Sequence, residues 1–149
     1  MTETEMMRPI EILLVEDSPG DVRLTQVGFR NARILNNMHV AADGVEAMAF
    51  LRRTGKYAAS PRPDLILLDL NLPKKDGREV LAEIKVDPDL KQIPVVIMTT
   101  SSAEEDILKT YNLHVNAYVT KPIDLDKFMQ MIKSIGDFWL TVVRLPTWK

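Results

Sequence analysis

The stretch that decides the fold is Leu65-Ile66-Leu67-Leu68-Asp69-Leu70-Asn71-Leu72-Pro73. Its opening apolar run follows Pro63-Asp64 and predicts a strand that is buried on both faces of a parallel sheet. The strand ends on the carboxylate of Asp69, and Pro73 and Gly77 indicate a turn soon afterwards. Ligands and chemistry gather outside the carboxyl ends of strands in such sheets. Asp69 is therefore a candidate ion ligand or nucleophile, although an Asp considered alone is more often a polar cap on a strand end.

The bulk composition is that of one globular domain. The 149 residues are 46% hydrophobic and 27% charged, and the net charge of −2 comes without a basic run, so nothing predicts a nucleic-acid partner. Cysteine is absent from the sequence, which excludes disulfides and thiolate chemistry. No apolar run approaches the length of a membrane span, and the acidic start over residues 1–5 is unlike a signal peptide. We therefore expect a cytoplasmic protein that binds neither membrane nor nucleic acid.

Short apolar runs alternate with amphipathic stretches along the chain. The runs predict strands over residues 10–15, 38–42, 65–69, 94–98 and 116–119. The amphipathic stretches predict helices from residue 18, from residue 43, over 77–86, around 107–111 and over 128–142. This strict alternation indicates an α/β fold, a flavodoxin-like doubly wound parallel sheet of five strands in the order 2-1-3-4-5 with five helices. We expect a leader over 1–8, the domain over 9–143 and a tail over 144–149.

Two helix starts carry clear local signals. Ser18 is the expected N-cap of the first helix, and Asp21 is favourable in its first turn. Asp43, with Glu46 three residues later, has the capping pattern of the second helix. Asp43 and the glycine after it are also compatible with a hairpin turn, but residues 47–51 do not alternate as a strand would. We therefore expect a helix there.

Polar groups follow the ends of the predicted strands. Glu16 and Asp17 follow the first strand, Asp69 ends the third, Thr99 follows the fourth and Lys121 follows the fifth. In the expected order, these four strands are contiguous, so the groups converge at one edge of the sheet. Three close carboxylates require a compensating cation, and a small number of oxygen ligands favours Mg²⁺. Because a lysine suits a phosphoryl oxygen, the set predicts a phosphoryl site with Asp69 as nucleophile.

Each of these residues also has a purely structural interpretation. Glu16 and Asp17 could serve only the N-terminus of the following helix, where acids are favoured. Thr99 and Thr100 could be loop hydroxyls bonded to the backbone, and Lys121 could be a solvated surface charge. Their joint occurrence, each at its own strand end, favours the phosphoryl site.

This constellation resembles the receiver domain of two-component response regulators, which has the CheY-like fold. The resemblance covers nearly the whole chain, and the separations of Thr99 and Lys121 from Asp69 are typical of that family. It implies that Asp69 accepts a phosphoryl group from a histidine kinase. It also implies that Mg²⁺ is the cofactor, held by Glu16, Asp17 and Asp69. By the same resemblance, the chain is not an enzyme beyond its own phosphorylation and dephosphorylation.

Further roles follow from the resemblance, residue by residue. The backbone carbonyl of Asn71 would be another metal ligand. Thr99 would be the switch hydroxyl and Tyr118 the switch aromatic, with plain core filler as the alternative for Tyr118. Lys121 would contact the phosphoryl group, and the peptide between Lys121 and Pro122 would be the family's usual cis bond.

A more specific resemblance lies in several separate segments. Residues 60–81, Leu113-His114-Val115-Asn116 and Asp137-Phe138-Trp139-Leu140 are similar to stand-alone regulators that serve cyanobacterial-type phytochromes. The Gly- and Pro-containing stretch 52–63 predicts a loop longer than in a minimal receiver, which fits the same subgroup. The implied partner is a phytochrome-type histidine kinase. Some members of the subgroup lack a proline after the lysine, so Pro122 is a difference from them. It leaves the catalytic pattern intact.

The residues at the end of the sequence indicate how the regulator is expected to pass on its signal. Residues 144–149 are too few for a DNA-binding or enzymatic output domain, so the signal is expected to pass by protein contact. Phe138, Trp139 and Leu140 concentrate apolar surface near that end, which is typical of an interface. We expect a homodimer that uses Tyr118 and these three residues. A tail folded back on its own domain is the alternative.

Three other functions share parts of this pattern. An FMN carrier has the same topology, but Glu16 and Asp17 would repel its phosphate. A haloacid-dehalogenase-type phosphatase uses a strand-end Asp with a second acid two residues later, where this chain has Asn71. A phosphorylation-independent pseudo-receiver, acting as a scaffold or dimerisation module, is the main alternative. Such chains usually lack one of the acids or the lysine, and this sequence has them all.

Overall fold

Strands and helices alternate along the computed structural model, which describes residues 9–100, 115 and 117–138. The strands of this part are β1 (Ile10–Val15), β2 (Asn36–Ala41), β3 (Leu65–Asp69), β4 (Val95–Thr99) and β5 (Ala117–Thr120). Its helices are α2 (Pro19–Asn31), α3 (Gly44–Arg52), α4 (Gly77–Val86) and α6 (Leu125–Phe138), with a 3₁₀ turn, η1 (Gly55–Tyr57), inside the predicted loop. None of these helices is long and apolar enough to cross a membrane. The leader, the helix expected around 107–111, Trp139 and Leu140 lie outside the described residues.

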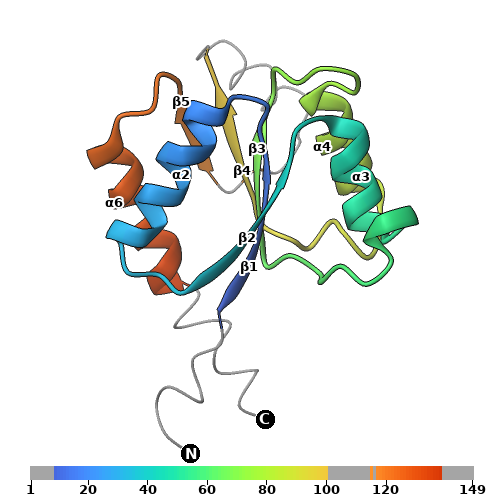
Figure 1. Cartoon of the computed structure of the whole chain (residues 1–149), viewed down its shortest axis with the longest axis horizontal. Coiled ribbons are helices and arrows are strands. Elements are labelled where there is room, and N and C mark those ends of the chain that lie inside the picture. Colours follow the sequence, from blue (N-terminus) through green and yellow to red (C-terminus); the bar gives the residue numbers. More distant parts are fainter. Residues whose placement is uncertain (1–8, 101–114, 116, 139–149) are drawn as a thin grey trace, which may run out of the picture.

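The strands form one parallel sheet in the order β2-β1-β3-β4-β5, as predicted. Helices α2 and α6 cover one face of the sheet, and α3 and α4 cover the other (Figure 1). The register places Val15 beside Leu68 and Asp69 beside Met98, so β1, β3 and β4 finish next to one another. The predicted doubly wound α/β fold is confirmed, and its functional edge is the one where these strands end.

Each central strand contributes to two cores, because successive side chains point to opposite faces of a sheet. The core under α3 and α4 contains the strand residues Leu13, Val15, Ile66 and Leu68. The core under α2 and α6 contains the alternate residues Ile12, Leu14, Leu65 and Leu67. All four apolar residues of β3 are at most 1% exposed. The apolar run of β3, residues 65–68, is therefore buried on both faces, as predicted.

The bounds of β2, β4 and β5 differ from the prediction, and β5 ends at Thr120, one residue later than predicted. β2 begins at Asn36 and ends at Ala41, not over 38–42. It is an edge strand, so polar residues can face water, and the Asn37 amide donates to Glu11 on β1 at 2.8 Å. β4 runs one residue later than predicted and ends on Thr99. The apolar pattern locates the three strands but misses the polar residues that belong to their ends.

The helix starts follow the predicted capping. The Ser18 hydroxyl accepts from the Asp21 N–H at 3.3 Å, and the Asp43 carboxylate accepts from the Glu46 N–H at 2.8 Å. Helix α3 therefore begins after Asp43, and the hairpin alternative is wrong. Gly44 is required here, because a Cβ would lie 2.2 Å from the carbonyl oxygen of Lys75. This close approach packs the start of α3 directly against the loop between β3 and α4.

Candidate functional site

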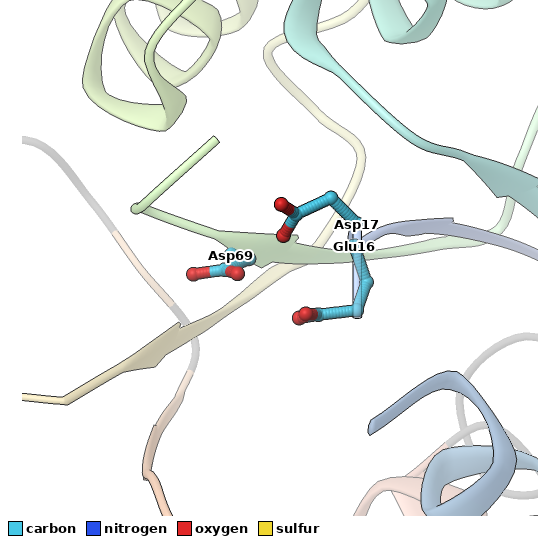
Figure 2. Close-up of side chains that lie close together, drawn as sticks. All are labelled: Glu16, Asp17 and Asp69. Atoms are coloured by element: carbon cyan, nitrogen blue, oxygen red, sulfur yellow. The ribbon is translucent and has the colours of Figure 1, made fainter. Parts of the chain in front are cut away.

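Three predicted site acids meet at the carboxyl ends of neighbouring strands. Glu16 and Asp17 follow β1, and Asp69 is the last residue of β3. One carboxylate oxygen from each lies within 4.8 Å of the other two. Figure 2 shows the three carboxylates directed toward a common region beyond the strand ends. Glu16 and Asp69 are buried, whereas Asp17 is exposed, so water reaches the cluster from the Asp17 side.

Lys121 joins this cluster from the end of β5. Its Nζ lies 2.8 Å from Glu16 Oε2 and 2.9 Å from Asp69 Oδ2, so one ammonium bridges two buried carboxylates. The backbone N–H of Lys121 donates to the Thr99 carbonyl at 2.7 Å, which ties the lysine to the end of β4. The peptide bond between Lys121 and Pro122 is cis, as predicted. The structure thus brings Lys121 to the acids as the sequence analysis expected.

A fourth carboxylate, Asp21, also contacts this lysine. Asp21 Oδ2 lies 3.1 Å from Lys121 Nζ, and the Asp21 side chain is 24% exposed. From the sequence, Asp21 was predicted only as a favourable acid in the first turn of this helix. No sequence pattern indicates this contact, because Asp21 belongs to α2 and Lys121 follows β5, and only the packing of the helix against the sheet brings them together.

Burial and charge act in opposite directions on the groups of this cluster. Burial raises the pKa of Glu16 from its usual 4.5 to about 7, and the charge of Asp69 adds to this while the hydrogen bond from Lys121 opposes it. Burial by itself would lower the pKa of Lys121. Hydrogen bonds to Glu16, Asp69 and Asp21 outweigh burial and raise that pKa above its usual range. The lysine is therefore a permanent cation at neutral pH, whereas Glu16 is near its titration point.

The remaining predicted site residues border the cluster. The Asn71 N–H donates to Asp69 Oδ1 at 2.9 Å, and its side-chain amide lies 3.4 Å from the Thr100 hydroxyl. Thr99 is buried at the end of β4, the strand beside Asp69. Tyr118 lies beside Ile97 in the register and is partly buried against the core under α3 and α4. The metal role of the Asn71 carbonyl and the switch roles of Thr99 and Tyr118 stay predictions.

Ion pairs hold the loop that follows Asp69. Lys74 Nζ lies 3.5 Å from Asp43 Oδ2 at the start of α3. Lys75 donates to Glu83 on α4. At the end of this loop, Gly77 is needed because a Cβ would lie 2.3 Å from the carbonyl oxygen of Asp69. Neither pair was predicted from the sequence, and both tie the loop beside the phosphoacceptor candidate to neighbouring helices.

The donor set fits a hard divalent cation. When all are ionised, Glu16, Asp17, Asp21 and Asp69 carry a surplus of three negative charges over the single ammonium of Lys121, which contacts all of them except Asp17. The donor atoms are oxygens only, the set that Mg²⁺ and related ions prefer. The exposure of Asp17 leaves room for the water ligands that Mg²⁺ retains. Glu16, Asp17 and Asp69 are the residues that would hold such an ion.

Comparison with known proteins agrees with this geometry. Residues 12–133 match the response regulator receiver domain family. Response regulator Rcp1 of Synechocystis sp. is 56% identical over 138 residues, which cover 93% of this chain and 94% of Rcp1.

Two solved structures are similar over almost their full length. The phosphorylated cyanobacterial phytochrome response regulator RcpA is 54% identical, with a TM-score of 0.77, and the match covers 90% of this chain and 96% of RcpA. The Mn²⁺-bound form of Rcp1 is 55% identical, with a TM-score of 0.76 and the same coverage of 90% and 96%. These matches to receiver domains favour the interpretation of the chain as a receiver domain over its interpretation as an FMN carrier or a phosphatase. The chain belongs to the response regulator receiver domain family and is closely related to the cyanobacterial phytochrome response regulators.

Proposed function

We propose that this chain is a response regulator that accepts a phosphoryl group on Asp69 from a histidine kinase, with Mg²⁺ as cofactor. The observation that carries the proposal is the contact set of Asp69. Its carboxylate lies within 4.8 Å of Glu16 and Asp17, and 2.9 Å from the ammonium of Lys121. An acid that served only as a strand cap would not need this combination of acids and cation around it.

The transfer is a displacement at phosphorus. An Asp69 carboxylate oxygen attacks the phosphorus of a phosphohistidine, an O–P bond forms, and the P–N bond breaks with its electron pair left on the imidazole nitrogen. The Asn71 N–H and Lys121 hold the two Asp69 oxygens in different directions, which orients the carboxylate for attack. Lys121 is also placed to neutralise a phosphoryl oxygen. A bound Mg²⁺ would supply further neutralisation of the phosphoryl oxygens.

The proposed partner is a phytochrome-type histidine kinase. Support comes from the relatives, because RcpA is a cyanobacterial phytochrome response regulator that has been solved in a phosphorylated form. Mn²⁺ is bound in one Rcp1 structure, which supports a divalent ion at the corresponding acids. The high identity over nearly the whole length of Rcp1 extends this support to the present chain.

The proposed output is a contact with another protein. Phosphorylation of Asp69 would draw the Thr99 hydroxyl toward the phosphoryl group, because Thr99 ends β4, the strand beside the Asp69 strand. Tyr118 would move with it, because it lies on β5, the next strand after β4. We extend this to a homodimer that uses Tyr118 with Phe138 and the two residues that follow it. Light scattering with a Trp139→Ala variant tests the dimer, and an unchanged dimeric mass would remove that interface.

An intact-mass spectrum after incubation with acetyl phosphate and Mg²⁺ tests the proposed function. The expected result is one phosphoryl adduct on the wild type. The adduct should be lost in Asp69→Asn and after metal removal, and retained in the matched control Asp89→Asn, whose carboxylate is exposed outside the acid cluster. A folded wild type that takes no adduct would instead favour the scaffold alternative.

A further inference from the structure

The ammonium of Lys121 is bonded from three sides. A lysine ammonium has three N–H donors. Here the acceptors are Glu16 from the end of β1, Asp69 from the end of β3 and Asp21 from the first turn of α2. The distances from Nζ to these carboxylates are 2.8, 2.9 and 3.1 Å respectively. Each donor therefore has a carboxylate from a different element, and the side chain is held where the three elements meet.

Asp21 differs from the other two partners in its surroundings. Among the residues that the structure describes, the acids grouped closely enough to share a metal ion are Glu16, Asp17 and Asp69. Asp21 lies outside that group, and its carboxylate is paired with the ammonium of Lys121. Its backbone is fixed by the N-cap, because the Asp21 N–H donates to the Ser18 hydroxyl and its carbonyl accepts from Thr25 at 2.8 Å. Helix α2 thus presents a rigidly placed carboxylate to Lys121.

Phosphorylation changes what Lys121 must do. Once Asp69 carries a phosphoryl group, the lysine has to leave the carboxylate oxygen and donate to a phosphoryl oxygen instead. The bonds to Glu16 and Asp21 lie on other sides of the ammonium and need not break. We propose that Asp21 is a positioning residue for phosphoryl transfer, which holds the Lys121 ammonium in place while its third donor passes from Asp69 to the phosphoryl group. This inference rests on the proposed function of Asp69.

The rate of phosphorylation by acetyl phosphate tests the role of Asp21. Asp21→Ala should slow adduct formation about fivefold, the effect of losing one partly exposed ion pair from the transition state. Asp21→Asn keeps the shape and one acceptor oxygen, so it should slow the reaction less. The control is Asp126→Ala, which removes an exposed acid from the first turn of α6 and should leave the rate unchanged. A faster reaction in both Asp21 variants would overturn the proposal, since it would mean that Asp21 only repels the anionic donor.

A double-mutant cycle separates positioning from a general structural effect. In a Lys121→Ala background, Asp21→Ala should have no further effect on the rate, because its partner is gone. If the Lys121→Ala variant reacts too slowly to follow, the same cycle can be measured through the affinity of each variant for beryllofluoride, a phosphoryl analogue. Equal effects of Asp21→Ala in both backgrounds would overturn the proposal. A wild type that is phosphorylated with an unchanged Asp21→Ala rate defeats this inference alone, whereas an unreactive wild type defeats the proposed function.

Discussion

Carboxylates at the ends of β1 and β3 and carboxylates around α3 and α4 have opposite electrostatic surroundings. At the sheet edge, Glu16 and Asp69 are buried together against Lys121, and burial raises the pKa of Glu16 to about 7. Around the helices, Glu83 accepts from Lys75, and this hydrogen bond lowers the pKa of Glu83. The first group has more acid than its cation balances, whereas the second is matched by its own partners.

The same contrast appears at the helix caps. The backbone N–H of Glu46 lowers the pKa of Asp43, and the Tyr57 hydroxyl lowers that of Glu46. Acids that only hold structure are thus stabilised in their charged form by local donors. The acids at the strand ends are left with unbalanced charge, and such a surplus is typical of a site that binds a cation. Three predictions test this contrast.

Removal of the central cation should have the largest effect. Lys121→Met leaves Glu16 and Asp69 buried without their partner, and the free energy of unfolding should fall by about 3–5 kcal/mol. Lys75→Met is the matched control, because Lys75 and Glu83 are 27% and 28% exposed, and it should cost about 0–1 kcal/mol. Urea denaturation at pH 8 without divalent metal measures both. An equal loss of unfolding free energy in the two variants would contradict the proposed difference between the two regions.

The pH dependence of the free energy of unfolding should show that burial raises the pKa of Glu16. Its pKa is raised in the folded chain, so between pH 4.5 and about 7 the native state binds more protons than the unfolded state. The free energy of unfolding of the metal-free protein should therefore fall as pH rises through this window, by about 2–3 kcal/mol from this group. Urea denaturation from pH 5 to pH 8 measures the slope. Glu16→Gln should remove it, and a slope that persists in this variant belongs to other groups.

The cap of α3 should show a smaller effect with the opposite sign. Asp43→Ala removes the acceptor for the Glu46 N–H and should cost about 1 kcal/mol at pH 7. The pKa of Asp43 is lowered in the folded chain, so its contribution is present above the usual value of 3.8 and is lost as pH falls below it. The difference between Asp43→Ala and wild type should therefore become smaller as the pH is lowered toward the point at which the protein unfolds. A difference that grows on acidification would contradict this account.

Much of the fold could be predicted because the signals are local. The apolar run Leu65–Leu68 and the caps Ser18 and Asp43 depend on periodicity and on side-chain donors and acceptors within a few residues. The convergence of Glu16, Asp69 and Lys121 followed from topology, since the carboxyl ends of neighbouring parallel strands share one edge.

Other features depend on packing that no short pattern encodes. Asp21 reaches Lys121 only because of how α2 sits against the sheet, and its sequence position shows only a favourable first-turn acid. The start of β2 at Asn36 was missed because an edge strand can place polar residues in water. The pair Lys75 and Glu83 joins a loop to the following helix, and its side chains carry no sequence signal beyond their charge.

Titration calorimetry with Mg²⁺ tests most directly the claim that the surplus of acids at the strand ends serves to bind a cation. Wild type should bind one ion per chain. Asp17→Asn should weaken binding at least about tenfold, because it removes a direct oxygen ligand. Glu83→Gln removes a carboxylate matched by its own lysine and should leave the affinity unchanged. Wild-type affinity in Asp17→Asn, or a loss as large in Glu83→Gln, would contradict the account.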